Sequence, residues 1–373
     1  MGLEKPRLKP SHPVIRTAAG DVVIGKLARN SYVVRDAPQA FVDLLLLLDG
    51  TRTTAQLADE LLADEEQVRR LVGQLAGAGL LDDGAAESAL SAVELERYDR
   101  QLLQFSAYER DSLPGFAYQE RLRVQRVCLL GMGGWGSWLA LNLALTGFGT
   151  LRLVDGDRVE LSNLGRQVLY DTSAVGELKV TAARDALRRI NPHVAVEEVP
   201  EFVGPDRAQV ERLLRDTTLI CLCWTNDAHF VPGTTGEMVH EVARRARIAV
   251  LEVAGDPFDV TVGPLYPNDG TGPCFRCVRP QLQSLWWGPG TTTSELRKAQ
   301  LSVTPLRRTE NWQSAPSLST MAGLAVNDLM AFATGYAEPT LLGRRFSVAL
   351  RTLETRTDEF TARADCCATH PLS

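Results

Sequence analysis

The chain has 373 residues, of which 45% are hydrophobic and 23% charged, so it is globular in composition and too long for one typical domain. A formal net charge of −6 argues against nucleic acid as the main partner. The seven cysteines are too few and too clustered for the disulfide framework of a small secreted protein. No apolar signal segment opens the chain, and we expect a cytoplasmic protein.

The first predicted domain, residues 12–84, combines three short strands with three short helices. Residues 14–16 and 22–25 flank a turn signal and predict a hairpin, and residues 32–34 predict a third strand. The helices are expected to begin at Pro38, at Thr53 or Thr54, and at Asp64. This pattern predicts a small winged-helix-like α+β domain.

The run Leu-Asp-Gly-x-x-Thr-x-x-x-Leu at 48–57 and the third helix resemble PqqD-like elements, which bind the leader peptides of ribosomally made natural products. Winged helices also bind DNA. Here, however, three acidic residues at 64–66 offset Arg69 and Arg70, a poor balance for phosphate contacts. We expect instead that a leader peptide adds as a strand at the sheet edge, near the third strand and third helix.

A polar, alanine-rich linker at 85–95 leads to the second predicted domain, residues 96–373. After a helix expected at about 92–109, alternating strands and helices predict an α/β fold with a mainly parallel sheet. The candidate strands are 126–130, 150–155, 194–199, 219–223 and 248–253. Beyond Asp259 the pattern is less regular, and Trp-Trp-Gly-Pro-Gly at 286–290 indicates a long functional or interface loop.

Residues 127–151 carry no charge and could be weighed as a membrane span. Their six glycines instead predict a buried strand, a tight turn and a helix. The turn places Gly131, Gly133, Gly134 and Gly136 at the start of the helix, where free backbone N–H groups bind phosphate. Asp155, at the end of the next strand, is placed to accept hydrogen bonds from ribose hydroxyls. Both an NAD oxidoreductase and an ATP-using enzyme would have these features.

The residues that follow Asp155 distinguish an ATP-using enzyme from an NAD oxidoreductase. The run Asp-Gly-Asp-Arg-Val-Glu-Leu-Ser-Asn-Leu-Gly-Arg-Gln at 155–167 resembles the signature of the ThiF/MoeB and ubiquitin-activating superfamily. Three more motifs match in order: Arg-Tyr-x-Arg-Gln at 97–101, Gln-x-x-Leu at 119–122 and Gly-x-x-Lys at 176–179. The resemblance covers about residues 96–370. It implies a Rossmann-like adenylation domain that uses ATP and Mg²⁺.

The resemblance also implies roles for individual residues. It places Asn163, Arg166 and Lys179 on the phosphates, and it implies that Arg100 reaches across a homodimer interface into the partner's site. The residues at the nucleotide would be Gly131, Gly133, Gly134, Gly136, Asp155, Asp157, Asn163 and Gln167. The family's Thr-Asp-Asn, whose acid helps to hold Mg²⁺, is replaced by Thr225-Asn226-Asp227. We expect Asp227 to take that role after a local shift, and the alternative is weakened magnesium handling.

The cysteines fall into two groups. Cys128, Cys221 and Cys223 lie in apolar runs and are expected to be buried packing residues. Family members hold a structural zinc with two C-x-x-C pairs, which implies a four-coordinate site here. Its expected ligands are Cys274, Cys277 and Cys367, with His370 or Cys366 as the fourth; the alternative is free thiols without metal.

No cysteine lies between Val278 and Asp365, which argues against thioester transfer. A peptide-binding domain joined to such an adenylating domain is similar to the microcin C-type and pantocin-type activating enzymes. The resemblance implies ATP-dependent adenylation of a carboxyl or amide group on a precursor peptide, without nucleic acid or membrane as partners. The alternatives are a non-catalytic leader-binding partner of a YcaO cyclodehydratase and a sulfur-carrier-protein adenylyltransferase. An NAD oxidoreductase would be supported by the glycine loop alone.

Overall fold

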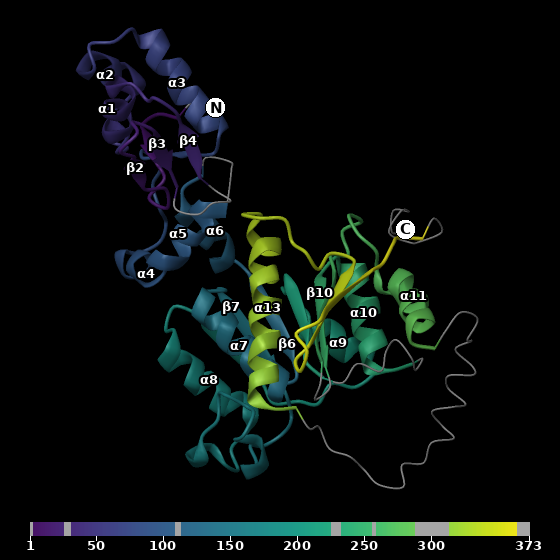
Figure 1. Cartoon of the computed structure of the whole chain (residues 1–373). Coiled ribbons are helices and arrows are strands. Elements are labelled where there is room, and N and C mark those ends of the chain that lie inside the picture. Colours follow the sequence, from purple (N-terminus) through teal and green to yellow (C-terminus); the bar gives the residue numbers. More distant parts are fainter. Residues whose placement is uncertain are drawn as a thin grey trace. The chain divides into compact units, whose positions relative to one another are not determined.

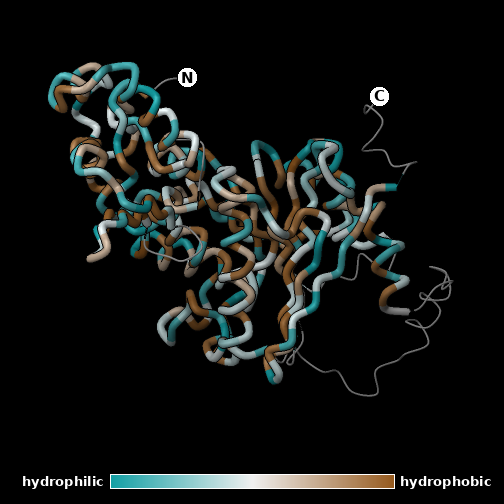
Figure 2. Tube along the Cα trace, turned by 45° about the horizontal axis from the view of Figure 1, so that its top comes forward, coloured by the Kyte–Doolittle hydropathy of each residue, from teal (hydrophilic) through white to brown (hydrophobic). Residues whose placement is uncertain are grey.

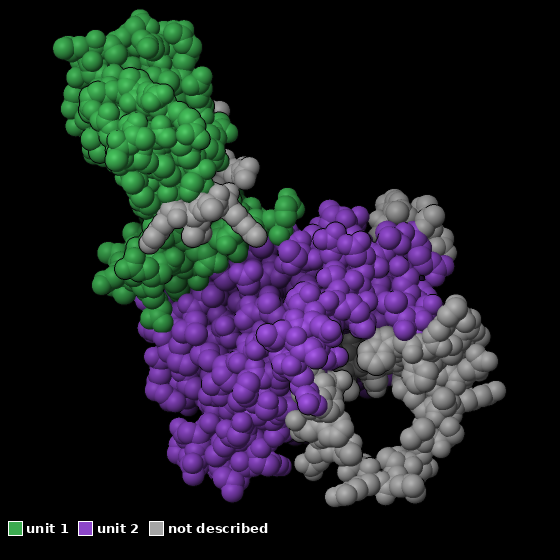
Figure 3. All heavy atoms as spheres, viewed as in Figure 1, with its two compact units in different colours: residues 1–122, 334–338 green, residues 123–333, 339–373 purple. Residues whose placement is uncertain are grey.

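The computed structural model describes residues 3–25, 31–108, 113–224, 233–255, 259–287 and 313–363. The chain divides into two compact units, 1–122 with 334–338 and 123–333 with 339–373 (Figure 3). The expected domain bounds, 12–84 and 96–373 with a linker at 85–95, stay predictions. The described part has the predicted α/β class, with a large sheet, helices and small N-terminal sheets (Figure 1).

The first unit contains two small antiparallel sheets. The predicted hairpin and third strand form the sheet β2-β3-β4, with β2 at Val14–Arg16, β3 at Val22–Ile24 and β4 at Tyr32–Val34. A second sheet, which the sequence did not predict, pairs β1 at Pro6–Leu8 with β5 at Leu81–Asp83. The pairing of β1 therefore depends on residues about seventy positions away in the chain.

Three helices cover the small sheets, and their starts follow the predicted caps. They are α1 at Gln39–Leu47, α2 at Thr54–Glu60 and α3 at Glu65–Gly77. Thr53 forms a capping box with Gln56, and the Asp64 side chain accepts a hydrogen bond from the backbone N–H of Gln67. The apolar faces meet in a core that includes Val22, Ile24, Leu44, Leu57, Val68, Leu80 and Leu81.

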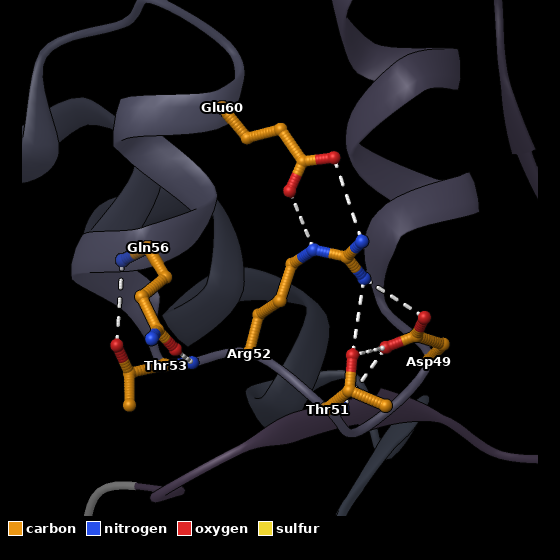
Figure 4. Close-up of polar contacts among 6 residues, drawn as sticks. All are labelled: Asp49, Thr51, Arg52, Thr53, Gln56 and Glu60. Carbon is orange, nitrogen blue, oxygen red and sulfur yellow. Dashed lines mark hydrogen bonds and ion pairs between the residues drawn. The ribbon is translucent and has the colours of Figure 1, made fainter.

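The Leu-Asp-Gly run forms the turn between α1 and α2 (Figure 4). One Asp49 oxygen accepts hydrogen bonds from the backbone and hydroxyl of Thr51, at 2.9 and 2.6 Å. Arg52 donates from Nη1 to the other Asp49 oxygen at 2.8 Å and from Nε to Glu60 at 2.5 Å. These bonds, led by the one from the Thr51 hydroxyl, lower the pKa of Asp49 to about 2. The motif thus ties the turn to the last residue of α2 through Arg52.

Three further helices complete the described part of the first unit. The single helix expected at about 92–109 is interrupted at Tyr98, giving α4 at Ala92–Arg97 and α5 at Asp99–Tyr108. Helix α6 spans Gly115–Arg123. Gln101 donates a hydrogen bond to the buried Gln119 at 2.5 Å, so two of the four sequence motifs contact each other.

The second unit is built on an eight-stranded sheet of order β13-β12-β11-β10-β9-β6-β7-β8. Strands β8, β7, β6, β9 and β10 are parallel, as expected, and their order reverses at the β6–β9 boundary. Ligands of such sheets bind at the carboxyl ends of the strands near this reversal. The parallel strands are β6 at Arg126–Leu130, β7 at Thr150–Val154, β8 at Ala195–Val199, β9 at Leu219–Leu222 and β10 at Ala249–Gly255.

Beyond Asp259, where we expected a less regular chain, the described residues form regular elements, and Trp286 and Trp287 end a helix. Residues 288–312, which hold the rest of the expected loop, lie outside the described residues. Antiparallel strands extend the sheet there, namely β11 at Asp259–Tyr266, β12 at Arg344–Ala349 and β13 at Thr355–Glu359. Two helices, α11 at Phe275–Trp287 and α13 at Ala315–Thr334, belong to the same region. Strand β13 is mostly exposed and polar, so it lacks the apolar alternation that predicts a strand.

Helices cover both faces of the large sheet. Helices α9 at Arg207–Leu213 and α10 at Thr235–Ala246 lie with α11 on one side, around a core of side chains from the strands (Figure 1). Helices α7 at Gly134–Thr146 and α8 at Lys179–Ile190 lie with α13 on the other. The central strands are mostly hydrophobic (Figure 2). Residues 127–151 form β6, the turn and α7, and none of the described helices is long and apolar enough to cross a membrane.

Candidate active site

The glycine loop joins β6 to α7, at the point where the strand order reverses. Gly131 has φ +100°, and a Cβ there would lie 3.0 Å from the carbonyl oxygen of Cys223, directly after β9. A Cβ on Gly136 would collide with the Gly131 carbonyl, and one on Gly134 would lie 2.8 Å from Leu318 of α13. Only glycine therefore fits at positions 131 and 136 of this turn. Gly133, at the N-cap of α7, has no capping side chain, which leaves the first turn suited to a phosphate.

Asp155 fixes the shape of this loop. Its Oδ2 accepts a hydrogen bond from the Met132 N–H at 2.6 Å, and its Oδ1 accepts one from the Asp157 N–H at 2.8 Å. A carboxylate oxygen accepts more than one hydrogen bond, so these contacts are compatible with the expected bond to a ribose hydroxyl. Asp155 thus links the glycine loop to the signature that follows β7.

The same signature contacts the Gly-x-x-Lys motif. Lys179, the first residue of α8, donates from Nζ to Asp157 Oδ2 at 3.0 Å and from its backbone N to the Asp157 carbonyl at 2.9 Å. The Lys179 side chain is 9% exposed and that of Asp157 is 53% exposed. The Asp157 carboxylate therefore orients the Lys179 ammonium group, which is nearly buried. A lysine that is expected to bind phosphate needs its ammonium group held in position in this way.

Asn163 holds the turn that carries the signature arginine. Its buried side-chain oxygen accepts a hydrogen bond from the Glu160 N–H at 3.1 Å, and its backbone carbonyl accepts from Arg166 at 3.0 Å. The Arg166 guanidinium donates to the Ser162 carbonyl at 2.9 Å. The Arg166 carbonyl accepts from the Trp138 indole at 3.0 Å, which ties the turn to α7. Asn163 thus acts on the turn, while Arg166 presents a half-buried charge.

Gln167 lies beside the N-cap of α7. It is 3% exposed, and its Nε2 would lie 4.0 Å from a Cβ built on Gly133. Its buried Oε1 has no hydrogen-bond partner among the described residues. A buried polar atom without a partner costs roughly 1–3 kcal/mol, and such atoms occur where a ligand completes the site. Gln167 thus fits its expected place at the nucleotide.

The sequence analysis missed Tyr170, which lies in the same site. Its hydroxyl donates to the Met132 carbonyl at 2.7 Å, and burial, with the nearby charges of Asp155 and Asp157, raises its pKa well above the ordinary value. Tyr170 is therefore a neutral donor that supports the glycine loop. It occupies no motif position, so only its nearness to Gln167 in the sequence hinted at a role.

Two expected catalytic residues are not placed in this arrangement. Arg100 lies on α5 in the first unit, with a side chain that is 90% exposed and 3.5 Å from Asp99. Its expected reach into a partner's site stays a prediction. Asp227 lies outside the described residues, which end at Trp224 and resume at Gly233. The expectation that it holds Mg²⁺ also stays a prediction.

The first cysteine pair lies at the start of α11. The sulfurs of Cys274 and Cys277 are 4.0 Å apart and buried, and the Arg363 N–H donates to Cys277 Sγ at 3.4 Å. Two thiolates on one tetrahedral zinc lie about 3.8 Å apart, so the pair fits half of the expected site. The described residues contain no group of three or more metal-binding side chains, and Cys366, Cys367 and His370 lie outside them.

The remaining cysteines behave as packing residues. Cys128, Cys221 and Cys223 are all buried in the central strands or directly after them. Burial raises the pKa of the Cys128 thiol to about 12 and raises the pKa values of the other two as well. None of the three is suited to nucleophilic chemistry, as the sequence predicted.

Two family models match the chain. The model of the ThiF family matches residues 98–368, and the PaaA-like, N-terminal domain matches residues 11–70. The chain belongs to the ThiF family. This ThiF-family chain is 35% identical over 191 residues to the molybdopterin-synthase adenylyltransferase of Escherichia coli (strain K12), covering 51% of this chain and 70% of that protein. It is 36% identical over 196 residues to the adenylyltransferase and sulfurtransferase uba4 of Emericella nidulans, covering 52% of this chain and 38% of that protein.

Solved structures extend the likeness to nearly the whole chain. The crystal structure of PaaA matches with 39% identity and a TM-score of 0.76, covering 95% of this chain and all of that one. MccB of E. coli, crystallised with ATP, matches with a TM-score of 0.72 over 97% of this chain and 99% of that one. At 19% identity the MccB likeness shows the fold alone. The ThiF-family chain is thus an ATP-dependent adenylyltransferase, which excludes the oxidoreductase alternative.

Proposed function

We propose that this adenylyltransferase activates a carboxyl or amide group on a ribosomally made precursor peptide, whose leader binds to the first unit. The observation that carries the proposal is the combination of a PaaA-like N-terminal domain with a ThiF domain in one chain. The likeness to PaaA at 39% identity over 95% of the chain supports it, because that likeness includes both parts.

The geometry of the second unit suits phosphoryl chemistry. Attack of a carboxylate on the α-phosphate of ATP expels pyrophosphate, and the negative charge that develops on the oxygens must be stabilised. The first turn of α7 and the Lys179 ammonium, held by Asp157, supply fixed positive charge. Arg166 supplies a half-buried guanidinium. Asp227 would help to hold Mg²⁺, which would offset negative charge on the phosphates.

The first unit offers an edge for the leader peptide. Among the described residues, strand β4 pairs on one side only, with β3, and its Tyr32 and Val33 side chains are 36% and 53% exposed. The Tyr32 hydroxyl donates to the Ala78 carbonyl at the end of α3, at 2.7 Å. An extended peptide would add to the β4 edge beside α3, with backbone hydrogen bonds for affinity and alternate side chains for specificity.

Two further features belong to this proposal. The exposed Arg100 would enter the site of a second copy of the chain, so the active form would be a homodimer. A structural zinc would be held by Cys274, Cys277, Cys367 and either His370 or Cys366. The sulfur separation and the Arg363 N–H bond to Cys277 support thiolate ligands, because backbone N–H groups stabilise a thiolate.

The test is ATP–pyrophosphate exchange by the purified protein, with and without the precursor peptide encoded beside it. We expect peptide-dependent exchange that Lys179→Ala abolishes. Arg188→Ala is the control, because it removes an exposed positive charge from the last turn of the same helix. Tight peptide binding without exchange would contradict the proposal and indicate a leader-binding partner of another enzyme, such as a YcaO cyclodehydratase.

A second candidate function is adenylation of a sulfur-carrier protein. The 35% identity to the molybdopterin-synthase adenylyltransferase of E. coli favours it, although the match covers only 51% of this chain. Such an enzyme would not need the N-terminal domain. Exchange stimulated by a sulfur-carrier protein, and not by the precursor peptide, would establish this alternative.

A further inference from the structure

An exposed phenylalanine lies against the loop that carries Asp155. Phe202, in the segment after β8, is 69% exposed. The nearest atoms to a Cβ built on Gly156 are its ring carbons, at 2.6 to 2.8 Å. Any side chain at residue 156 would displace the ring, so Phe202 rests directly on the backbone next to Asp155. The ring thus lies at the carboxyl edge of the sheet, one residue from the carboxylate expected at the ribose.

Single exposed apolar side chains are common, so exposure alone carries no argument. The distinguishing feature of Phe202 is the way its loop is held. One side-chain amide, that of Gln209 on α9, donates to the Phe202 carbonyl at 2.9 Å and accepts from the Gly204 N–H at 2.9 Å. Glu201 forms an ion pair with Arg212 at 2.6 Å. The loop is thus fastened on both sides of the exposed ring.

The neighbouring residue turns the other way. Val203 is partly buried and packs against the core of the sheet and α10, which keeps Phe202 on the outside. A hollow opens beside it, lined by Val203, Pro205, Trp224 and the residues 233–236 at the start of α10. The fastened ring, the hollow and the carboxylate at 155 thus lie along one edge of the same sheet.

A ligand that matches this edge has a flat ring system joined by a glycosidic bond to a sugar whose hydroxyls can reach Asp155. We propose that Phe202 is the platform on which the purine base of ATP stacks, with the ribose at Asp155 and the base directed toward the hollow. This inference rests on the use of ATP by the site. Base–aromatic stacking contributes enough that alanine substitution weakens binding by about 5- to 100-fold.

The test compares two ligands that share phosphates and differ in the base. Binding of ATP and of inorganic tripolyphosphate, each with Mg²⁺, would be measured by calorimetry on the full chain and on three variants. We expect Phe202→Ala to weaken ATP binding by about 5- to 100-fold and to leave tripolyphosphate binding unchanged. Phe202→Trp should restore ATP binding. Leu353→Ala, which truncates a 74% exposed side chain in the turn after β12, is the control for removal of surface apolar area.

Equal ATP affinity in Phe202→Ala and in the unmodified chain would overturn the inference. A parallel loss of tripolyphosphate binding would also overturn it, because Phe202 would then act on the fold of the loop and not on the base. If the unmodified chain bound no ATP, the proposed function would fail with the inference. This result is distinguishable from the other two, because in both of those the unmodified chain binds ATP.

Discussion

The ion pair between Lys179 and Asp157 allows a direct test of how much one contact of the candidate site stabilises the second unit. We consider Asp157→Asn, which preserves the shape of the side chain and removes its charge. At the observed 3.0 Å, Coulomb's law gives about 1.4 kcal/mol in water and about 5.5 kcal/mol at an effective dielectric constant of about 20. Asp157 is 53% exposed, so solvent screens the pair, and the lower part of this interval applies. We expect a loss of about 1–2 kcal/mol of stability.

Tryptophan fluorescence makes this loss measurable in the second unit alone, because all six tryptophans lie between residues 135 and 312. Urea unfolding would be followed in the absence of nucleotide, so that ligand contacts do not contribute. With a slope of roughly 2 kcal/mol per molar, the midpoint should fall by about 0.5–1 M. Peptide-dependent exchange should fall as well, because Lys179 loses the partner that orients it.

The matched control is Glu359→Gln, which removes a carboxylate from an ion pair with Arg344 whose partners are 65% and 50% exposed. Such a surface pair contributes about 0–1 kcal/mol, so the midpoint should hardly move. If Asp157→Asn shifted the midpoint no more than Glu359→Gln does, the argument that burial of Lys179 makes its partner necessary would be refuted.

Two other predictions concern the turn between α1 and α2 and the cysteines. The folded pKa of Asp49 is lowered to about 2, chiefly by the Thr51 hydroxyl, so its contribution to stability is present above about pH 4 and is lost as pH falls toward 2. Asp49→Asn should flatten this dependence in amide exchange of α1 and α2, and an unchanged acid profile would contradict it. Cys277→Ser should reduce the zinc content of the purified protein, whereas Cys128→Ser should not; equal zinc in both variants would argue against the proposed site.

Much of the candidate site could be predicted from the sequence, because its residues act through local backbone geometry. Strand β6 has the predicted bounds, and Gly131 and Gly136 after it are required by the turn that they form. The caps at Thr53 and Asp64 were likewise predictable, since each bonds a backbone group three residues away. Motif order along the chain indicated the family, which the matched models confirm.

Tertiary structure alone decided the features whose partners are distant in the sequence. Strand β1 begins with a proline and has only three residues, and it forms because Asp82 binds Arg7 at 2.8 Å and the backbone of β5 pairs with it. Strand β13 is polar and gains its place by pairing with β12. Tyr170 and Phe202 occupy no motif position, and each acquires its place only when another loop folds against it. Local sequence carries no signal for such contacts, because their stabilisation depends on groups that folding brings together.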